Sequence, residues 1–218
     1  MKTLRRFIVP LLLLHAATGA VAAEPRLERT SAPPDKVPAA IREALDPQGY
    51  RVLKADGTPL AQIWLRQQLP VSGKKTVEGA NYPALSPSML VGVIEYPAAG
   101  KDFRGQPIKP GVYTMRYALL PADGNHMGVA PDRDFLLLSL VGDDPVANSV
   151  LRYEELLKLS TKAAGTNHPL ALSMVAAPPS VPAAYTDPND YVVLAAKLDT
   201  SGGALPIAII VKGVSMSF

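Results

Sequence analysis

Two histidines are the side chains with the widest chemical range in the main part of the chain. His126 and His168 each follow an asparagine, Asn125 and Asn167, in stretches whose composition predicts loops. Loops carried by a rigid sheet are where sites are usually built, and a neutral imidazole is the commonest side-chain ligand of first-row metals. We therefore take both histidines and both asparagines as candidate binding residues.

A metal centre is one chemistry that these histidines allow. Asp123 and Asp134 lie on either side of His126, so two loops meeting in space would offer two imidazoles and a carboxylate. That set is the minimum for a catalytic zinc or a non-haem iron. Asp123 is thus a further candidate binding residue, and His126, His168 and Asp134 are candidate metal ligands.

The spacing of these residues argues against a metal. No pair has the H-E-x-x-H or H-x-H spacing that places two ligands on one element. The competing interpretation leaves His126 in solvent and lets His168 bond the last carbonyls of a preceding helix. We therefore expect no cofactor, and a divalent metal bound by the two histidines remains the alternative.

Other catalytic and binding motifs are weak. The chain has no G-x-S-x-G nucleophile motif and no phosphate-binding glycine pattern, so serine hydrolases with that motif and nucleotide-binding proteins have no support. The single tryptophan, Trp64, is a candidate for stacking on a sugar or peptide, against the alternative of an aromatic half-buried in a sheet. These observations favour a binding protein without chemistry of its own.

The charge distribution predicts export. The 218 residues include 22 Lys and Arg against 19 Asp and Glu. Lys2, Arg5 and Arg6 precede the apolar run Phe7 to Leu14 and then a stretch of small residues, the order of parts in a secretory signal peptide. Cleavage after Ala22 would leave equal numbers of basic and acidic side chains. We expect a periplasmic or secreted protein without a nucleic-acid partner, which would require excess positive charge.

The mature chain must hold itself together by its core, because it contains no cysteine and so no disulfide. No apolar run after the signal is long enough for a transmembrane helix. We expect a signal peptide over residues 1–22, a charged flexible arm over 23–36 and one domain over 37–218.

Apolar periodicity predicts mostly strands. A hairpin is predicted where Asp56-Gly57 separates two apolar-bearing runs, Tyr50 to Ala55 and Leu60 to Gln67. Alternation within the second run places Trp64 on the face opposite the aliphatic residues. The apolar pattern predicts strands covered on both sides over Met89 to Tyr96 and Asp134 to Val141. It predicts a half-buried strand over Val112 to Leu120. The last strand pair is Tyr191 to Leu198 and Leu205 to Lys212, after a Pro-rich connector over 176–190.

Two short helices complete the prediction. Val37, Ile41 and Leu45 recur four residues apart, which indicates one helical face. A second helix is expected to start at Asp143 to Pro145 and to end at Gly165. The predicted fold is therefore mainly β, an antiparallel β-sandwich with one or two short helices packed on it.

A family resemblance supports this fold. The segment GKDFRGQPIKPGVYTMRY, within Leu90 to Tyr117, forms a strand, turn and strand pattern that resembles uncharacterised secreted bacterial β-sandwich proteins classed as domains of unknown function. The segments PADGNHMG, RDFLLL and AAGTNHP are also similar to parts of uncharacterised exported proteins. The resemblance covers Val37 to Val175 and implies the fold and export, but no catalytic residue.

The expected function is an exported soluble binding or envelope-associated module that takes an envelope or extracellular ligand. The first alternative is a metal-dependent enzyme or metal-binding protein that uses His126 and His168. The second is a small outer-membrane β-barrel, because Val214, Met216 and Phe218 alternate with small residues at the C-terminus.

Overall fold

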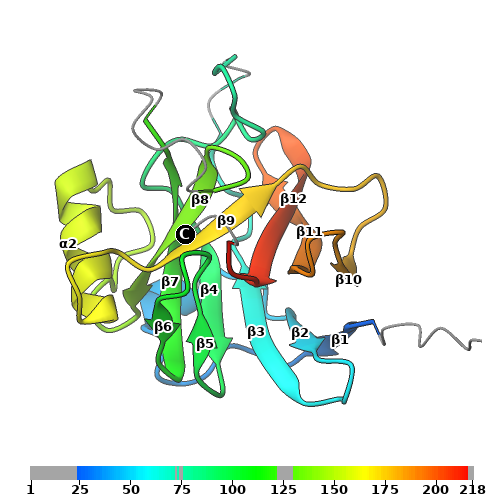
Figure 1. Ribbon diagram of the computed structural model, residues 1–218. Coiled ribbons are helices and arrows are strands. Elements are labelled where there is room, and N and C mark those ends of the chain that lie inside the picture. Colours follow the sequence, from blue (N-terminus) through cyan, green and yellow to red (C-terminus); the bar gives the residue numbers. More distant parts are fainter. Residues whose placement is uncertain (1–23, 72, 74–75, 122–129, 216–218) are drawn as a thin grey trace, which may run out of the picture.

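The computed structural model describes residues 24–71, 73, 76–121 and 130–215. Within these residues, ten antiparallel strands form one sheet in the order β1-β2-β3-β4-β7-β8-β9-β12-β11-β10 (Figure 1). The predicted mainly β fold with short helices is confirmed. The predicted sandwich is not, because the strands belong to a single sheet that curls until it is nearly barrel-shaped.

The elements are short. Strands of the sheet that follow one another along the chain are neighbours in it except after β9, which pairs with β12, while β10 lies at the edge beside β11. The strands of the sheet are β1 (Arg26–Thr30), β2 (Gly49–Leu53), β3 (Pro59–Leu65), β4 (Leu90–Tyr96), β7 (Gly111–Leu119), β8 (Asp134–Leu140), β9 (Ala171–Val175), β10 (Ala183–Thr186), β11 (Val192–Thr200) and β12 (Gly203–Lys212). A separate hairpin consists of β5 (Gly100–Lys101) and β6 (Pro107–Ile108), and the helices are α1 (Ala39–Arg42) and α2 (Tyr153–Ala164).

The predicted flexible arm is in part an edge strand. Residues Arg26–Thr30 pair with β2 as β1, and the guanidinium of Arg29 lies 4.4 Å from the ring centroid of Tyr50. At the other edge, β10 lies inside the Pro-rich connector over 176–190, where the sequence pattern predicts no strand. The two edge strands contact each other, and the backbone N–H of Thr186 donates to the Glu24 carboxylate over 3.0 Å. Tertiary pairing overrides the weak local signal in both segments.

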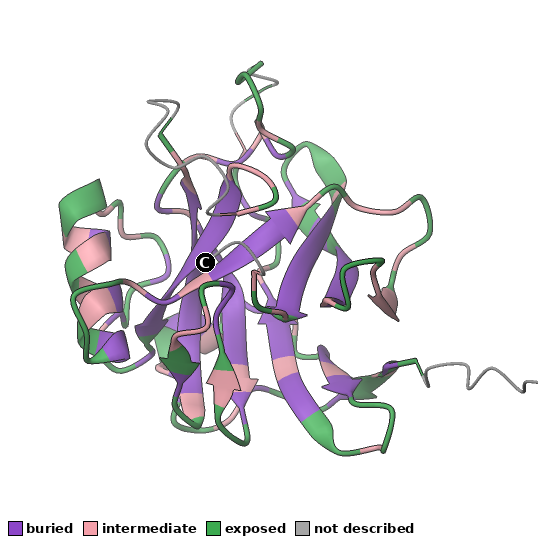
Figure 2. Ribbon diagram, in the orientation of Figure 1, coloured by how far each residue is buried: buried purple, intermediate pink, exposed green. Residues whose placement is uncertain are grey.

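The concave face of the sheet encloses the main core. Alternate residues of nearly every strand point inward, as Ile63, Met115, Leu136 and Ile209 do, and all are almost completely buried. Residues one position along each strand point outward, because side chains alternate across a sheet. The strands are therefore buried along most of their length, whereas the outward side of α2 is exposed (Figure 2).

Three coverings bury the outward face of the sheet. Residues 37–45, including α1, cover Trp64 and its neighbours. Helix α2 covers Phe135 and Leu137 on β8, which confirms that this strand is buried on both sides. Phe103 and the segment that leads to β11 cover a third cluster around Val193. Neither described helix has the length and apolar composition of a membrane span.

The second helix starts later than predicted because Asp144 has another role. Its carboxylate accepts two hydrogen bonds from the guanidinium of Arg116, over 2.6 and 2.7 Å, and one from the hydroxyl of Thr114 over 2.7 Å. Helix α2 instead begins after Arg152 and ends at Gly165, where φ is +71° as a left-handed cap requires. The predicted end is thus confirmed and the predicted start is wrong.

The same ion pair changes the character of β7. The period-two pattern predicts a half-buried strand, with Thr114 and Arg116 on the solvent side. Both are fully buried. Arg116 also donates to the backbone carbonyls of Ser88, Val146 and Ser149, so the residues after β8 fold back over this face. The buried charge of Arg116 is tolerated because it is paired with the Asp144 carboxylate and its N–H groups donate to backbone carbonyls.

Candidate functional site

The turn between β5 and β6 is held by a buried carboxylate. Asp102 is 0% exposed and accepts hydrogen bonds from the backbone N–H groups of Arg104, over 3.0 Å, and Gln106, over 2.8 Å. Gly105 has a φ of +80°, which the tight turn requires. Burial raises the pKa of Asp102 above its usual range, although these donors partly offset the effect. The turn therefore presents Arg104 outward in a defined direction.

Gln106 attaches this turn to the segment that follows α2. Its side-chain amide donates to the carbonyl oxygens of His168, over 3.2 Å, and Pro169, over 3.1 Å. Its side-chain oxygen accepts from the hydroxyl of Thr166, which also accepts from the His168 backbone N–H. These contacts hold the hairpin turn and residues 166–169 together.

The attachment of the β5–β6 turn to residues 166–169 brings a guanidinium and an imidazole into contact. Arg104 Nη2 lies 3.2 Å from His168 Nδ1, and both residues are exposed. A guanidinium can only donate, so His168 Nδ1 is the acceptor in this contact. Arg104 forms no ion pair with the described residues. Its positive charge is therefore available to an anion.

This pair lies on the edge of an apolar pocket of about 260 Å³, which we call the His168 pocket. Its walls come from the β5–β6 turn, β8, β9 and α2, and three of its residues are aromatic. The lining residues are Phe103, Arg104, Leu120, Ala130, Phe135, Tyr153, Leu157, His168, Pro169, Ala171 and Ser173. A benzene molecule occupies a cavity of roughly 150 Å³, so this space suits one or two rings.

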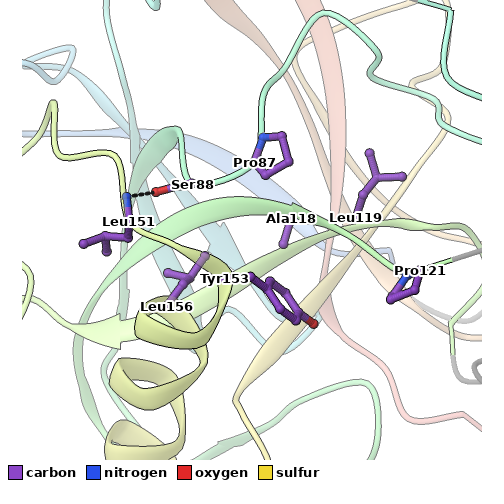
Figure 3. A pocket seen from close by; sticks show the side chains of 8 residues that line it. All are labelled: Pro87, Ser88, Ala118, Leu119, Pro121, Leu151, Tyr153 and Leu156. Atoms are coloured by element: carbon purple, nitrogen blue, oxygen red, sulfur yellow. Dashed lines mark hydrogen bonds between the residues drawn. The ribbon is translucent and has the colours of Figure 1, made fainter.

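A second hollow adjoins it on the other side of Tyr153. This Pro87 pocket has a volume of about 250 Å³ and is lined almost entirely by apolar groups (Figure 3). Tyr153 projects from the first turn of α2 toward Pro121 and forms a wall of both pockets. The one hydrogen bond drawn there joins the Leu151 backbone N–H to the Ser88 hydroxyl oxygen over 2.8 Å. The Pro87 pocket therefore extends the apolar surface without adding a charge.

The arrangement suits binding of an amphipathic ligand. Apolar walls attract a ring or short chain by burial, and the positive charge at the edge attracts a carboxylate or similar group. A pocket with few placed polar groups is typical of small-molecule sites. No described carboxylate or hydroxyl is placed with His168 as a catalytic pair would be.

Of the residues predicted from sequence, the structure places His168 and Asn167 on this surface. His168 contributes to the pocket, and its ring faces Arg104 instead of the helix carbonyls. Asn167 is exposed beside it. His126, Asn125 and Asp123 lie outside the described residues. Within the described part of the chain, no group of three or more His, Asp or Glu side chains is placed to hold a metal ion.

Asp134 serves the core and not a metal. It is 0% exposed and accepts hydrogen bonds from the backbone N–H groups of Asn81 and Tyr82, over 2.7 and 3.1 Å. The hydroxyl of Tyr117 donates to it over 2.6 Å. Burial, together with this carboxylate, raises the pKa of Tyr117, so the phenol stays protonated. Both carboxylate oxygens are thus committed inside the fold.

Trp64 is a core residue and not a stacking surface. Its side chain points to the face opposite Ile63 and Leu65, as the strand period predicts, but the residue is only 2% exposed. The indole N–H donates to the carbonyl of Ser31 over 2.8 Å. The segment around α1 covers the ring, which the strand pattern alone does not reveal.

Arg104 and Tyr153 are the site residues that sequence reasoning missed. Arg104 sits in a segment with turn chemistry, and Tyr153 belongs to the apolar stripe of a helix, so each has an ordinary structural explanation. No spacing rule connects either of them with His168. No known family model, curated protein or solved structure matches the chain, and the site is therefore interpreted from its geometry.

Proposed function

We propose that the protein is an exported, non-catalytic binding protein whose His168 pocket holds a small ligand with an apolar body and one anionic group. The observation that carries this proposal is the position of the Arg104 guanidinium, which forms no ion pair with the described residues and lies on the edge of an apolar pocket. The aromatic side chains of Phe103, Phe135 and Tyr153 favour a planar ring as the ligand body.

Export is the second part of the proposal and rests on the sequence. The basic, apolar and small-residue segments over residues 1–22 follow the order of a secretory signal. A periplasmic or extracellular location would expose the pocket to small organic acids outside the cell. The metal-dependent alternative gains no specific support, because Arg104 places a positive charge beside the one described histidine.

Calorimetric titration with two ligands of the same shape tests the proposal. Phenylacetate has a ring and a carboxylate, and phenylacetamide has the same ring without the charge. We expect phenylacetate to bind about tenfold more tightly, which corresponds to about 1.4 kcal/mol for one charge-assisted contact. The Arg104→Gln variant is expected to lose that preference. Equal binding of the two ligands would contradict the proposed anion contact.

Matched variants separate the pocket from the general charge of the protein. Arg26→Gln removes one positive charge from the exposed edge strand β1 and is expected to leave phenylacetate binding unchanged. Tyr153→Ala removes the wall between the two pockets and is expected to weaken both ligands, whereas Tyr153→Phe keeps the ring and the affinity. A loss of affinity in Arg26→Gln equal to that in Arg104→Gln would show that the effect is nonspecific.

A further inference from the structure

A larger cavity, with different lining residues from the His168 pocket, lies at one open end of the curled sheet. Its volume is about 770 Å³, within the range of roughly 300 to 1,000 Å³ for small-molecule sites. The ends of β2 and β12, the start of β3, the β5–β6 hairpin and the turn between β10 and β11 contribute to its lining. We call it the mouth cavity, since ligand sites are common in the mouths of barrel-like sheets.

Three lysines from separate strand ends line the mouth cavity. They are Lys54 after β2, Lys101 on β5 and Lys212 at the end of β12, and all three are exposed. Their ammonium groups form no ion pair with the described residues, whereas Lys36 and Lys162 elsewhere pair with carboxylates. Asp190 is the one acid of the lining, so the cavity carries an excess of two positive charges.

The remaining lining is largely apolar and well supported. Leu60, Tyr191 and Val214 present hydrocarbon surface, and Val214 is 38% exposed. The Tyr191 ring packs edge-on against Phe103 with centroids 5.2 Å apart. A side chain at Gly213 would place its Cβ 2.5 Å from that ring, so glycine is required where β12 ends. Tyr191 is therefore held in place across the cavity wall.

The turn that carries the acid is also ordered. Asp187 accepts hydrogen bonds from the backbone N–H groups of Asn189 and Tyr191, each over 2.9 Å. Asp190 has a φ of +62° within this turn. These hydrogen bonds order this part of the cavity rim without a bound partner. The cavity thus combines a supported apolar wall with an excess of positive charge.

We infer that the mouth cavity is a second binding site, for a single-chain amphiphile with a phosphate monoester head group. A phosphate monoester carries about −1.5 to −2 charges at pH 7, which matches the charge excess of the rim. Lysine binds phosphate as a flexible point charge, so three ammonium groups can approach one head group. The alkyl chain would pack against Leu60, Tyr191 and Val214 and gain from burial.

Titration with three compounds tests both halves of this inference. Octyl phosphate has the head group and the chain, octyl glucoside has the chain alone, and inorganic phosphate has the charge alone. We expect octyl phosphate, below the concentration at which it forms micelles, to bind at least tenfold more tightly than either of the others. Equal binding of octyl glucoside or of inorganic phosphate would overturn the proposal.

Variants identify the cavity as the place of binding. The triple variant Lys54→Gln, Lys101→Gln and Lys212→Gln is expected to weaken octyl phosphate binding about tenfold, most strongly at low salt. A control that changes the exposed lysines Lys109, Lys158 and Lys197 to glutamine alters the net charge equally and should leave binding intact. An equal loss in both triple variants would show that the attraction is diffuse and would overturn the inference.

Two further variants test the apolar contacts of the mouth cavity and the independence of the two sites. Val214→Ser removes hydrocarbon surface without changing the charge and is expected to weaken octyl phosphate binding several-fold. Val214 and the substituted lysines are exposed, so the thermal unfolding temperature of these variants should not change. Arg104→Gln should leave octyl phosphate binding unaltered, and the mouth triple variant should retain phenylacetate binding. The failure of one site is thereby distinguishable from failure of the other.

Discussion

The guanidinium of Arg104 and the imidazole of His168 lie 3.2 Å apart although 64 residues separate them in the chain. The contact depends on a turn built around a buried carboxylate and on one glutamine that joins this turn to the segment after α2. Asp102 and Gln106 thereby position the positive charge of Arg104 at an apolar pocket, although neither of them lines that pocket.

Removing the link between the two segments should weaken ligand binding while Arg104 stays intact. Gln106→Ala deletes the hydrogen bonds to the carbonyls of His168 and Pro169. We expect phenylacetate affinity to fall roughly 2- to 12-fold, the effect of losing one ordinary hydrogen bond, because the guanidinium is less well positioned. Gln67→Ala, at an exposed position outside both pockets, serves as the control. Unchanged affinity in Gln106→Ala would refute the positioning role.

The buried ion pair between Arg116 and Asp144 should be a major determinant of stability. Arg116→Ala leaves a buried carboxylate and several carbonyl oxygens without their donors. We expect the free energy of unfolding in urea to fall by about 3 to 5 kcal/mol. Arg116→Lys keeps the charge but cannot form the two-pronged contact, and it should also destabilise.

An exposed ion pair provides the comparison. Arg42 and Asp35 lie 3.1 Å apart on the surface, and Arg42→Ala should change the unfolding free energy by less than about 1 kcal/mol. Should Arg116→Ala and Arg42→Ala prove equally mild, the buried network would not hold the residues after β8 in place.

Asp102 should make stability depend on pH in a definite direction. Burial raises its pKa in the folded state, so folding favours the protonated carboxyl. Its contribution to stability is therefore present at low pH and is lost as the pH rises through the folded-state pKa. In Asp102→Asn this dependence disappears, because the amide does not titrate in this range.

The measurement is urea unfolding of both proteins between pH 3 and pH 7. We expect the native protein to lose stability relative to Asp102→Asn as the pH increases. The amide oxygen can still accept from the backbone N–H groups of Arg104 and Gln106, so the variant should fold. A constant difference between the two proteins, or a difference with the opposite slope, would contradict the prediction.

Local patterns in the sequence determine much of the secondary structure. A period-two run indicates β7, and a run that is apolar on both faces indicates β8. Asp56-Gly57 indicates the turn between β2 and β3, and Gly165 indicates the end of α2. These features depend on alternation, turn chemistry and capping, which act between residues close in the chain. The side of β3 on which Trp64 lies follows from the same alternation.

Tertiary structure alone decides which segments meet. Periodicity states which face of a strand a residue occupies, but it does not identify what covers that face. It therefore could not show that β1 and β10 form the edges of one curled sheet, that Arg116 is buried against Asp144, or that Trp64 is covered. The candidate site depends on the same kind of long-range contact. Arg104 becomes a site residue only because the docked hairpin places it beside His168.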